Sequence, residues 1–177
     1  DECQRSFDIL KERMMTAPVM SYPREHGRYV LDTDASATAI GGVLQQEQLD
    51  EKTGKIELKV ISYGSRVLKD AETRYCARRR ELLAIVDFIK MFRTYLLGPN
   101  KFIIRTDHAS LKYLDRLNDP HDQFARWLQF LQEYNYEIEI RKGKDHANAD
   151  GLSRLGPFAP CKDEVGKDSK GRSIIKN

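Results

Sequence analysis

Residues 28–46 read RYVLDTDASATAIGGVLQQ, and this stretch decides how the fold begins. Arg28 to Thr33 and Ala39 to Gln46 are rich in apolar and β-branched residues, so each is predicted to form a strand. The polar link from Ala35 to Thr38 is too short for a crossover, which makes the two strands an antiparallel hairpin. After a charged turn, the alternating stretch from Ile56 to Tyr63 adds a third strand. The chain therefore begins its sheet as a three-stranded meander.

The rest of the chain predicts helices and two further strands. The longest helix runs from about Ala71 to Leu97, with Asp70 as its cap and Gly98-Pro99 at its end. The later elements are a strand at Lys101–Thr106, a short helix at Ser110–Leu114, a helix at Gln123–Glu133, a strand at Tyr136–Arg141 and a short helix at Ala147–Leu155. The predicted order is βββαβααβα.

The long helix between the third and fourth strands permits a crossover. Right-handed crossovers place the later strand parallel to one that is already in the sheet. We therefore predict an α/β fold, with a five-stranded mixed sheet of three antiparallel strands followed by parallel strands, flanked by helices. If the fourth strand lies beside the first, both end at the same edge of the sheet, which is where α/β sheets usually bind ligands.

Three acidic residues are expected near that edge. Asp34 follows the apolar run Tyr29-Val30-Leu31, and Asp107 follows Phe102-Ile103-Ile104, so each lies at the end of a strand. Glu81 shares a helical stripe with the apolar residues that should face the sheet. Carboxylates that converge repel one another, and bound Mg²⁺ or Mn²⁺ relieves that repulsion. Two such ions about 4 Å apart can support in-line hydrolysis of a phosphodiester.

Each acid also has a simpler interpretation. Glu81 could be an ion-pair partner of neighbouring arginines on a solvated helix edge. Asp34 or Asp107 could cap a loop. Acidic residues occur near strand ends in many folds, so their spacing alone does not establish a metal site.

Composition predicts a soluble, intracellular protein. The 177 residues, 40% of them apolar, suit one domain with tails, and no apolar run is long enough to cross a membrane. The net charge is only +3, so contact with a polyanion would depend on local clusters such as Arg78-Arg79-Arg80 and Arg141-Lys142-Gly143-Lys144. Each cluster alone fits an ordinary solvated surface equally well. Cys3, Cys76 and Cys161 have neither pairing nor metal-ligand spacing and are expected to be reduced.

Six short motifs are spread between residues 17 and 154. They are Ala17–Met20, Thr33–Ser36 with Gly41–Leu44, Glu81–Val86, Phe92–Gly98, Thr106–His108 and Asn148–Arg154. In this order they resemble the ribonuclease H region of gypsy-type long-terminal-repeat retrotransposons, joined to the end of the reverse transcriptase. The resemblance extends from Asp1 to about Leu155.

The resemblance implies a ribonuclease H fold and an endonuclease that cuts the RNA strand of RNA/DNA hybrids during reverse transcription. The implied cofactor is a pair of Mg²⁺ ions, for which Mn²⁺ can substitute. The four carboxylates implied to bind them are Asp34, Glu81, Asp107 and Asp150. The implied partners are the hybrid and the reverse transcriptase domain of the same polyprotein. The implied location is the cytoplasm, in virus-like particles, or the nucleus.

The same resemblance divides the chain into three parts. Residues 1–24 would be the C-terminal end of the reverse transcriptase or its connection segment, which includes the amphipathic stretch Cys3–Met15 whose apolar side chains need a partner. Residues 25–155 would be the ribonuclease H domain. Residues 156–177 are expected to be a linker or a disordered tail.

Three neighbours of the acids are weighed as accessories. Asp32 should point to the same face as Asp34, but the motif selects the acid before Ala35-Ser36, which leaves Asp32 as an accessory charge. His146 lies in the loop where many ribonucleases H carry a histidine that assists metal or product movement, and the alternative is an exposed loop histidine without a role. His108 is expected to be structural.

Two other functions compete with the nuclease. A catalytically inactive domain of the same fold could bind nucleic acid or support the polymerase, although all four acids are retained. An integrase-type DNA strand transferase shares the fold and an acidic triad, but the motifs and the polymerase-like N-terminal segment favour the ribonuclease.

Overall fold

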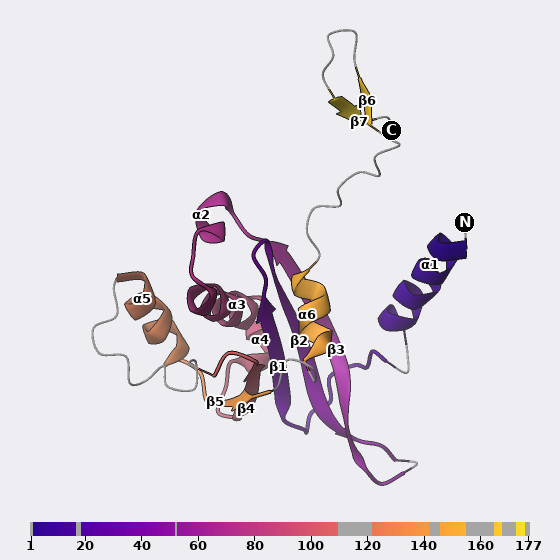
Figure 1. The fold of residues 1–177 in the computed structure, drawn as a ribbon. Helices are drawn as coiled ribbons and strands as arrows, with labels where there is room; N and C mark the ends of the chain where they lie inside the picture. Colours follow the sequence, from indigo (N-terminus) through magenta and orange to yellow (C-terminus); the bar gives the residue numbers. More distant parts are fainter. Residues whose placement is uncertain are drawn as a thin grey trace.

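In the computed structural model, the chain builds one five-stranded sheet with helices packed against it (Figure 1). The structure describes residues 2–16, 19–51, 53–109, 122–141, 146–154, 165–167 and 173–175. The strands of the sheet are β1 (Tyr29–Ala35), β2 (Ala39–Leu49), β3 (Ile56–Val67), β4 (Phe102–Thr106) and β5 (Tyr136–Ile140). The helices are α1 (Glu2–Met15), α2 (Asp70–Thr73), α3 (Ala77–Met91), α4 (Arg93–Leu96), α5 (Asp122–Leu131) and α6 (Ala147–Ser153).

The sheet has the order β3-β2-β1-β4-β5. β1, β2 and β3 pair antiparallel, as short connections between successive strands require. β4 pairs parallel with β1, and β5 pairs parallel with β4. The predicted mixed sheet is confirmed. The crossover through α3 brings the ends of β1 and β4 to the same edge, although the two strands are far apart in sequence.

Helices α3 and α6 cover opposite faces of the sheet. Successive residues of a strand point to opposite faces. A Cβ atom added at Gly42 would lie 2.6 Å from the Phe88 ring of α3, whereas one added at Gly41 would lie 2.5 Å from backbone atoms of Ala149 and Ser153 in α6. The two adjacent glycines of β2 therefore let both helices lie directly against the backbone of the sheet.

The main core lies between the sheet and α3. Leu82, Ile85, Phe88 and Ile89 recur at helical spacing and are completely buried. They pack with apolar side chains of the sheet and of α5 that belong to the same cluster, namely Leu31, Ile40, Leu44, Ile104, Trp127 and Leu131. Burial of each such side chain contributes roughly 1.5–3 kcal/mol. This core fixes α3, and with it Glu81, against the sheet.

The single long helix predicted from Ala71 to Leu97 is wrong. The structure has three helices there, α2, α3 and α4, with breaks before Ala77 and at Phe92. Cys76 is extended, with φ −65° and ψ 159°, and Phe92 leaves the helical region with φ −98° and ψ 19°. Asp70 is the first residue of α2 rather than its cap.

A side chain of β3 contacts both α2 and α3, on either side of the break between them. Arg66 of β3 donates to Glu72 in α2 at 2.8 Å and to Asp87 in α3 at 2.5 Å. Glu72 also accepts a hydrogen bond from the backbone N–H of Lys69 at 2.8 Å, which closes the start of α2. One arginine thus anchors two helices to β3, and helical periodicity alone does not reveal such a tie.

The ends of the chain carry fewer contacts with the sheet. None of the residues of α1 is buried, and the apolar side chains of Phe7, Ile9, Leu10 and Met14 are all exposed. Near the C-terminus, β6 (Val165–Lys167) pairs antiparallel with β7 (Ser173–Ile175). The predicted helix at 110–114 lies outside the described residues, and the predicted linker over 156–177 stays a prediction. Among the described helices, none is long and apolar enough to span a membrane.

Candidate metal centre

Three carboxyl groups from three different elements meet at the carboxyl edge of β1 and β4. Asp34 is near the end of β1, Asp107 directly follows β4, and Glu81 is in the second turn of α3. One oxygen atom from each side chain lies within 4.8 Å of the other two. The parallel pairing of β1 with β4 produces this geometry, because it brings the ends of both strands to one edge. The structure thus brings together three of the four acids singled out in the sequence.

Burial and mutual repulsion disfavour the ionised form of two of these acids. The side chain of Glu81 is buried, which is the main reason that its pKa rises to about 8, with further contributions from Asp34 and Asp107. A hydrogen bond from the backbone of Ala35 opposes this rise. Burial likewise raises the pKa of Asp34, and a hydrogen bond from Ser153 opposes it. A bound divalent cation would instead favour the ionised form of both acids, because its positive charge stabilises carboxylates.

The residues present fit a divalent cation. All three side chains offer carboxylate oxygens, the ligands preferred by hard cations such as Mg²⁺ and Mn²⁺. The Oε2 atom of Glu81 is buried and has no hydrogen-bond partner in the part of the chain that the structure describes. A buried polar oxygen without a partner is costly, and a metal ion would satisfy it.

The fourth acid, Asp150, stands outside the group of three. It lies in α6, and its carboxylate accepts hydrogen bonds of 2.8 Å at both oxygens from Nε of Arg154, with Nη2 at 2.6 Å from Oδ1. This contact lowers the pKa of Asp150. Asp150 also raises the pKa of Asp34 through its charge, so the two carboxylates interact electrostatically.

Helix α6 is attached to the sheet through small polar side chains. The hydroxyl of Ser153 donates to Oδ2 of Asp34 at 2.5 Å. Ser36 donates to the carbonyl of Ser153 at 2.6 Å, and Ser65 donates to the carbonyl of Leu152 at 2.8 Å. Sequence reasoning missed the role of Ser153. Its presence in the motif Asn148–Arg154 was the only signal, and the motif does not say what the hydroxyl contacts.

The alternative interpretation of His146 as an exposed loop histidine is wrong. His146 is buried, with 1% of its surface exposed, because it precedes α6 and packs against β1. Its Nε2 atom lies 2.8 Å from the carbonyl of Thr33. His108 is half-buried, and its backbone N–H donates to the hydroxyl of Thr106 at 3.2 Å. An accessory role for His146 stays a prediction.

The basic cluster at the start of α3 is partly engaged with aromatic side chains. The Arg79 guanidinium lies 4.0 Å from the centre of the Tyr75 ring, and Arg78 lies 5.7 Å from that of Phe124. Arg80 acts on the acids instead, because its charge opposes the rise in the pKa of Glu81. Of the second cluster, Arg141 is described and residues 142–145 lie outside the description.

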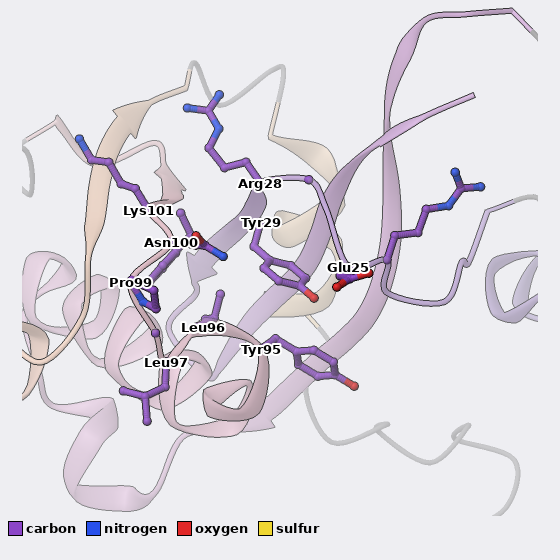
Figure 2. Close-up of a pocket in the computed structure, with 13 residues that line it drawn as sticks. Glu25, Arg28, Tyr29, Tyr95, Leu96, Leu97, Pro99, Asn100 and Lys101 are labelled. Carbon is purple, nitrogen blue, oxygen red and sulfur yellow. The ribbon is translucent and has the colours of Figure 1, made fainter. Parts of the chain in front are cut away.

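A separate hollow lies at the opposite end of β1 (Figure 2). Tyr29 and Tyr95 line it side by side, with their ring centres 6.0 Å apart. Its cationic side chains already have acidic partners, since Arg28 contacts Glu47 and Glu137, and Lys101 also contacts Glu137. The acidic group at the other end of the strand is therefore the stronger candidate site.

Comparisons with known proteins agree with this architecture. A family model described as an RNase H-like domain found in reverse transcriptase matches residues 25–134. The chain is 40% identical over 150 residues to the retrovirus-related Pol polyprotein from transposon 297 of Drosophila melanogaster. The matched region covers 85% of this chain and 13% of that protein. The chain therefore corresponds to a small part of the length of that relative.

Solved structures show the same fold at low sequence identity. The RNase H1 from the halophilic archaeon Halobacterium salinarum superposes with a TM-score of 0.52 at 18% identity, covering 71% of this chain and 94% of that one. A foamy viral protease-reverse transcriptase in complex with an RNA/DNA hybrid gives a TM-score of 0.51 at 16% identity. The match covers 81% of this chain and 19% of the viral one. The mixed sheet with its flanking helices is an RNase H fold. The chain belongs to the family of RNase H-like domains found in reverse transcriptases.

Proposed function

We propose that this domain is a metal-dependent endonuclease that hydrolyses the RNA strand of RNA/DNA hybrids during reverse transcription of a retrotransposon. The observation that carries the proposal is the convergence of Asp34, Glu81 and Asp107 within 4.8 Å at the edge of an RNase H fold. A group of acids with this geometry has little value for stability, since its members repel one another. A bound divalent cation would offset this repulsion, which explains why the three acids lie together.

The proposed role of each acid follows from where it lies in the fold. Asp34, Glu81 and Asp107 would hold the cation, and Asp150 would complete the set from α6. Divalent ions bound there would activate a water molecule and stabilise the charge on the leaving oxygen. The burial of Asp34 and Glu81 excludes bulk water from one side of the site, while the exposure of Asp107 leaves the other side open to a substrate.

The proposed substrate follows from relatives of the same fold. The foamy viral enzyme was solved in complex with an RNA/DNA hybrid, and the transposon 297 relative is a Pol polyprotein. We infer that this domain also acts on a hybrid and that its protein partner is the reverse transcriptase of the same polyprotein. The setting would be a cytoplasmic particle in which reverse transcription takes place.

Cleavage of matched substrates tests this function. An RNA strand labelled at its 5′ end is paired with DNA or with RNA, and a DNA duplex of the same sequence serves as the third substrate. We expect cleavage of the RNA in the hybrid with Mg²⁺, none with EDTA, and products with 3′-hydroxyl and 5′-phosphate ends. The rate should fall with rising salt, because cationic side chains would hold the backbone. Equal cleavage of the DNA duplex would instead identify a general nuclease, and binding without cleavage would identify an inactive domain.

A further inference from the structure

Asp32 is an acidic residue that is completely buried and yet stands apart from the three convergent carboxyl groups. It lies on β1 two residues before Asp34, so both side chains point to the face of the sheet that α6 covers. Burial of an acidic side chain in a strand is unfavourable unless specific partners compensate for the lost hydration. The partners of Asp32 therefore indicate what it does.

Those partners lie on both sides of the connection that leads into α6. The side-chain amide of Asn148 in the first turn of α6 donates to Oδ2 of Asp32 at 2.5 Å. The guanidinium of Arg141, directly after β5, lies 3.5 Å from the same oxygen. Asp32 thus holds the end of β5 and the start of α6 through a single atom. Next to this contact, His146 is anchored to the carbonyl of Thr33.

Asp150 lies between two attachments of α6 to the sheet. Its carboxylate is hydrogen-bonded to Arg154, which belongs to the same segment of chain and therefore does not fix it relative to the sheet. The far end of α6 is held by Ser153 and Asp34. The near end, two residues before Asp150, is held by Asn148 and Asp32. Because this helix of seven residues is hydrogen-bonded to β1 near both ends, its position against the sheet is defined.

We propose that Asp32 is a positioning residue that, through Asn148, fixes the start of α6 against β1 and thereby sets where Asp150 stands. The proposal deepens the proposed function and rests on it, because the placement of Asp150 matters most if Asp150 completes a metal site. Asp32 itself lies outside the group of three carboxyl groups that would hold the metal. Partners that orient metal ligands in this way typically change metal affinity by about 10–100-fold when they are altered.

Exchanging the side chains of Asp32 and Asn148 distinguishes a positioning role from a general effect on stability. Asn148→Asp places two carboxyl groups against each other and breaks the contact. Asp32→Asn added to that variant restores one amide–carboxyl hydrogen bond with the donor and acceptor exchanged. Glu137→Gln is the matched control, since it removes ion pairs with Arg28 and Lys101 at the other end of the sheet.

Two measurements are made well below the melting temperature of every variant. The first is metal dependence, measured both as the Mg²⁺ concentration for half-maximal cleavage and as Mn²⁺ affinity. The second is amide hydrogen exchange over residues 147–153. We expect Asn148→Asp to raise the half-saturating metal concentration about tenfold or more and to speed exchange in α6. The exchanged pair should recover most of both effects, and Glu137→Gln should change neither. Should Asn148→Asp fail to fold, Asn148→Ala, which adds no charge, takes its place and should shift both readouts in the same direction.

Two results would overturn the positioning role. One is parental metal dependence and parental exchange in the Asn148 variant. The other is an exchanged pair that is no better than Asn148→Asp alone. Failure of the proposed function looks different, because the unmodified domain would then cleave no hybrid in Mg²⁺. Hydrogen exchange and Mn²⁺ binding would still decide whether Asp32 positions α6.

Discussion

Ser153 donates its hydroxyl to Asp34 at 2.5 Å across 119 positions of sequence. The serine is completely buried at the last residue of α6, and the aspartate is near the end of β1. The hydrogen bond favours the ionised form of Asp34 and opposes the effect of burial on its pKa. The helix that carries Asp150 is thus linked directly to an acid of the convergent group. Because Ser153 and Asp34 are far apart in sequence, each can be substituted without changing the residues beside the other.

Ser153→Ala should weaken both the fold and metal binding. Loss of one buried hydrogen bond costs about 1–3 kcal/mol of stability. Without the donor, the pKa of Asp34 should rise further, so a cation must displace a proton more often. We expect Mn²⁺ affinity at pH 7 to fall by about tenfold and to recover partly at higher pH. Calorimetric titration over pH 6–9 measures both effects.

Ser65→Ala is the matched control for that experiment. It removes the hydrogen bond from Ser65 to the carbonyl of Leu152, which also attaches α6, but it touches no carboxyl group. Its loss of metal affinity should be much smaller than that of Ser153→Ala, because the exposed Ser65 makes only one of several attachments of α6. Equal losses in the two variants would mean that docking of α6, rather than the bond to Asp34, controls metal binding.

The stability of the metal-free protein should fall as pH rises through the range set by Glu81. Its pKa is raised from 4.5 to about 8 in the folded state. Between these values the folded protein keeps a proton that the unfolded chain has released, so unfolding becomes progressively easier. Relative to Glu81→Gln, the parent should lose up to about 1.4 kcal/mol per pH unit within this window.

Urea denaturation in EDTA at pH 5, 6, 7 and 8 checks this dependence. Glu133→Gln changes an exposed glutamate and should follow the parent at every pH. Added Mg²⁺ should stabilise the parent most at the high end of the range, where the ion replaces the proton. Parallel curves for the parent and Glu81→Gln would show that Glu81 titrates normally.

Local patterns explain which parts of the fold were predictable. β1 and β2 are adjacent in sequence, rich in apolar and β-branched residues and joined by a short polar link, so their antiparallel pairing follows from neighbouring residues. The crossover that places β4 beside β1 follows from the handedness of such connections. Asp34 and Asp107 could therefore be expected at one edge. The register of Glu81 on the buried stripe of α3 brought in the third acid.

Long-range contacts explain what the sequence did not reveal. On either side of the break before α3, Arg66 holds Glu72 and Asp87 on two different helices. The buried ring of His146 contacts the carbonyl of Thr33, which is 113 positions away. Periodicity within one segment carries no information on such partners, so these features needed three-dimensional structure.

Asp107→Asn should abolish cleavage without loss of stability. The substitution keeps the shape of the side chain and removes one charge from a group of acids that repel one another. Because Asp107 is exposed, the amide remains hydrated and the fold should be at least as stable as the parent. Mg²⁺ should also raise the melting temperature of this variant less than that of the parent.

Hybrid cleavage and thermal melting on the same Asp107→Asn preparation distinguish this role from a loop cap. A cap would show the reverse pattern, with modest destabilisation and retained metal-dependent cleavage. Parental cleavage rates in Mg²⁺ would remove Asp107 from the proposed site.

Gly41→Ala should displace α6 and remove activity, whereas Gly151→Ala should not. A Cβ atom at position 41 would lie 2.5 Å from both the carbonyl oxygen of Ala149 and the backbone nitrogen of Ser153, and backbone atoms cannot rotate away. The helix must shift, at a cost of about 1–3 kcal/mol, and the shift moves Asp150 away from Asp34. At Gly151 a Cβ atom would meet nothing within 4 Å, and alanine is the better helix former by about 0.5–1 kcal/mol. Gly151→Ala should therefore melt slightly higher and cleave hybrid at the parental rate. Hydrogen exchange over residues 147–153 should rise in Gly41→Ala alone, and full activity in that variant would show that cleavage tolerates a displaced α6.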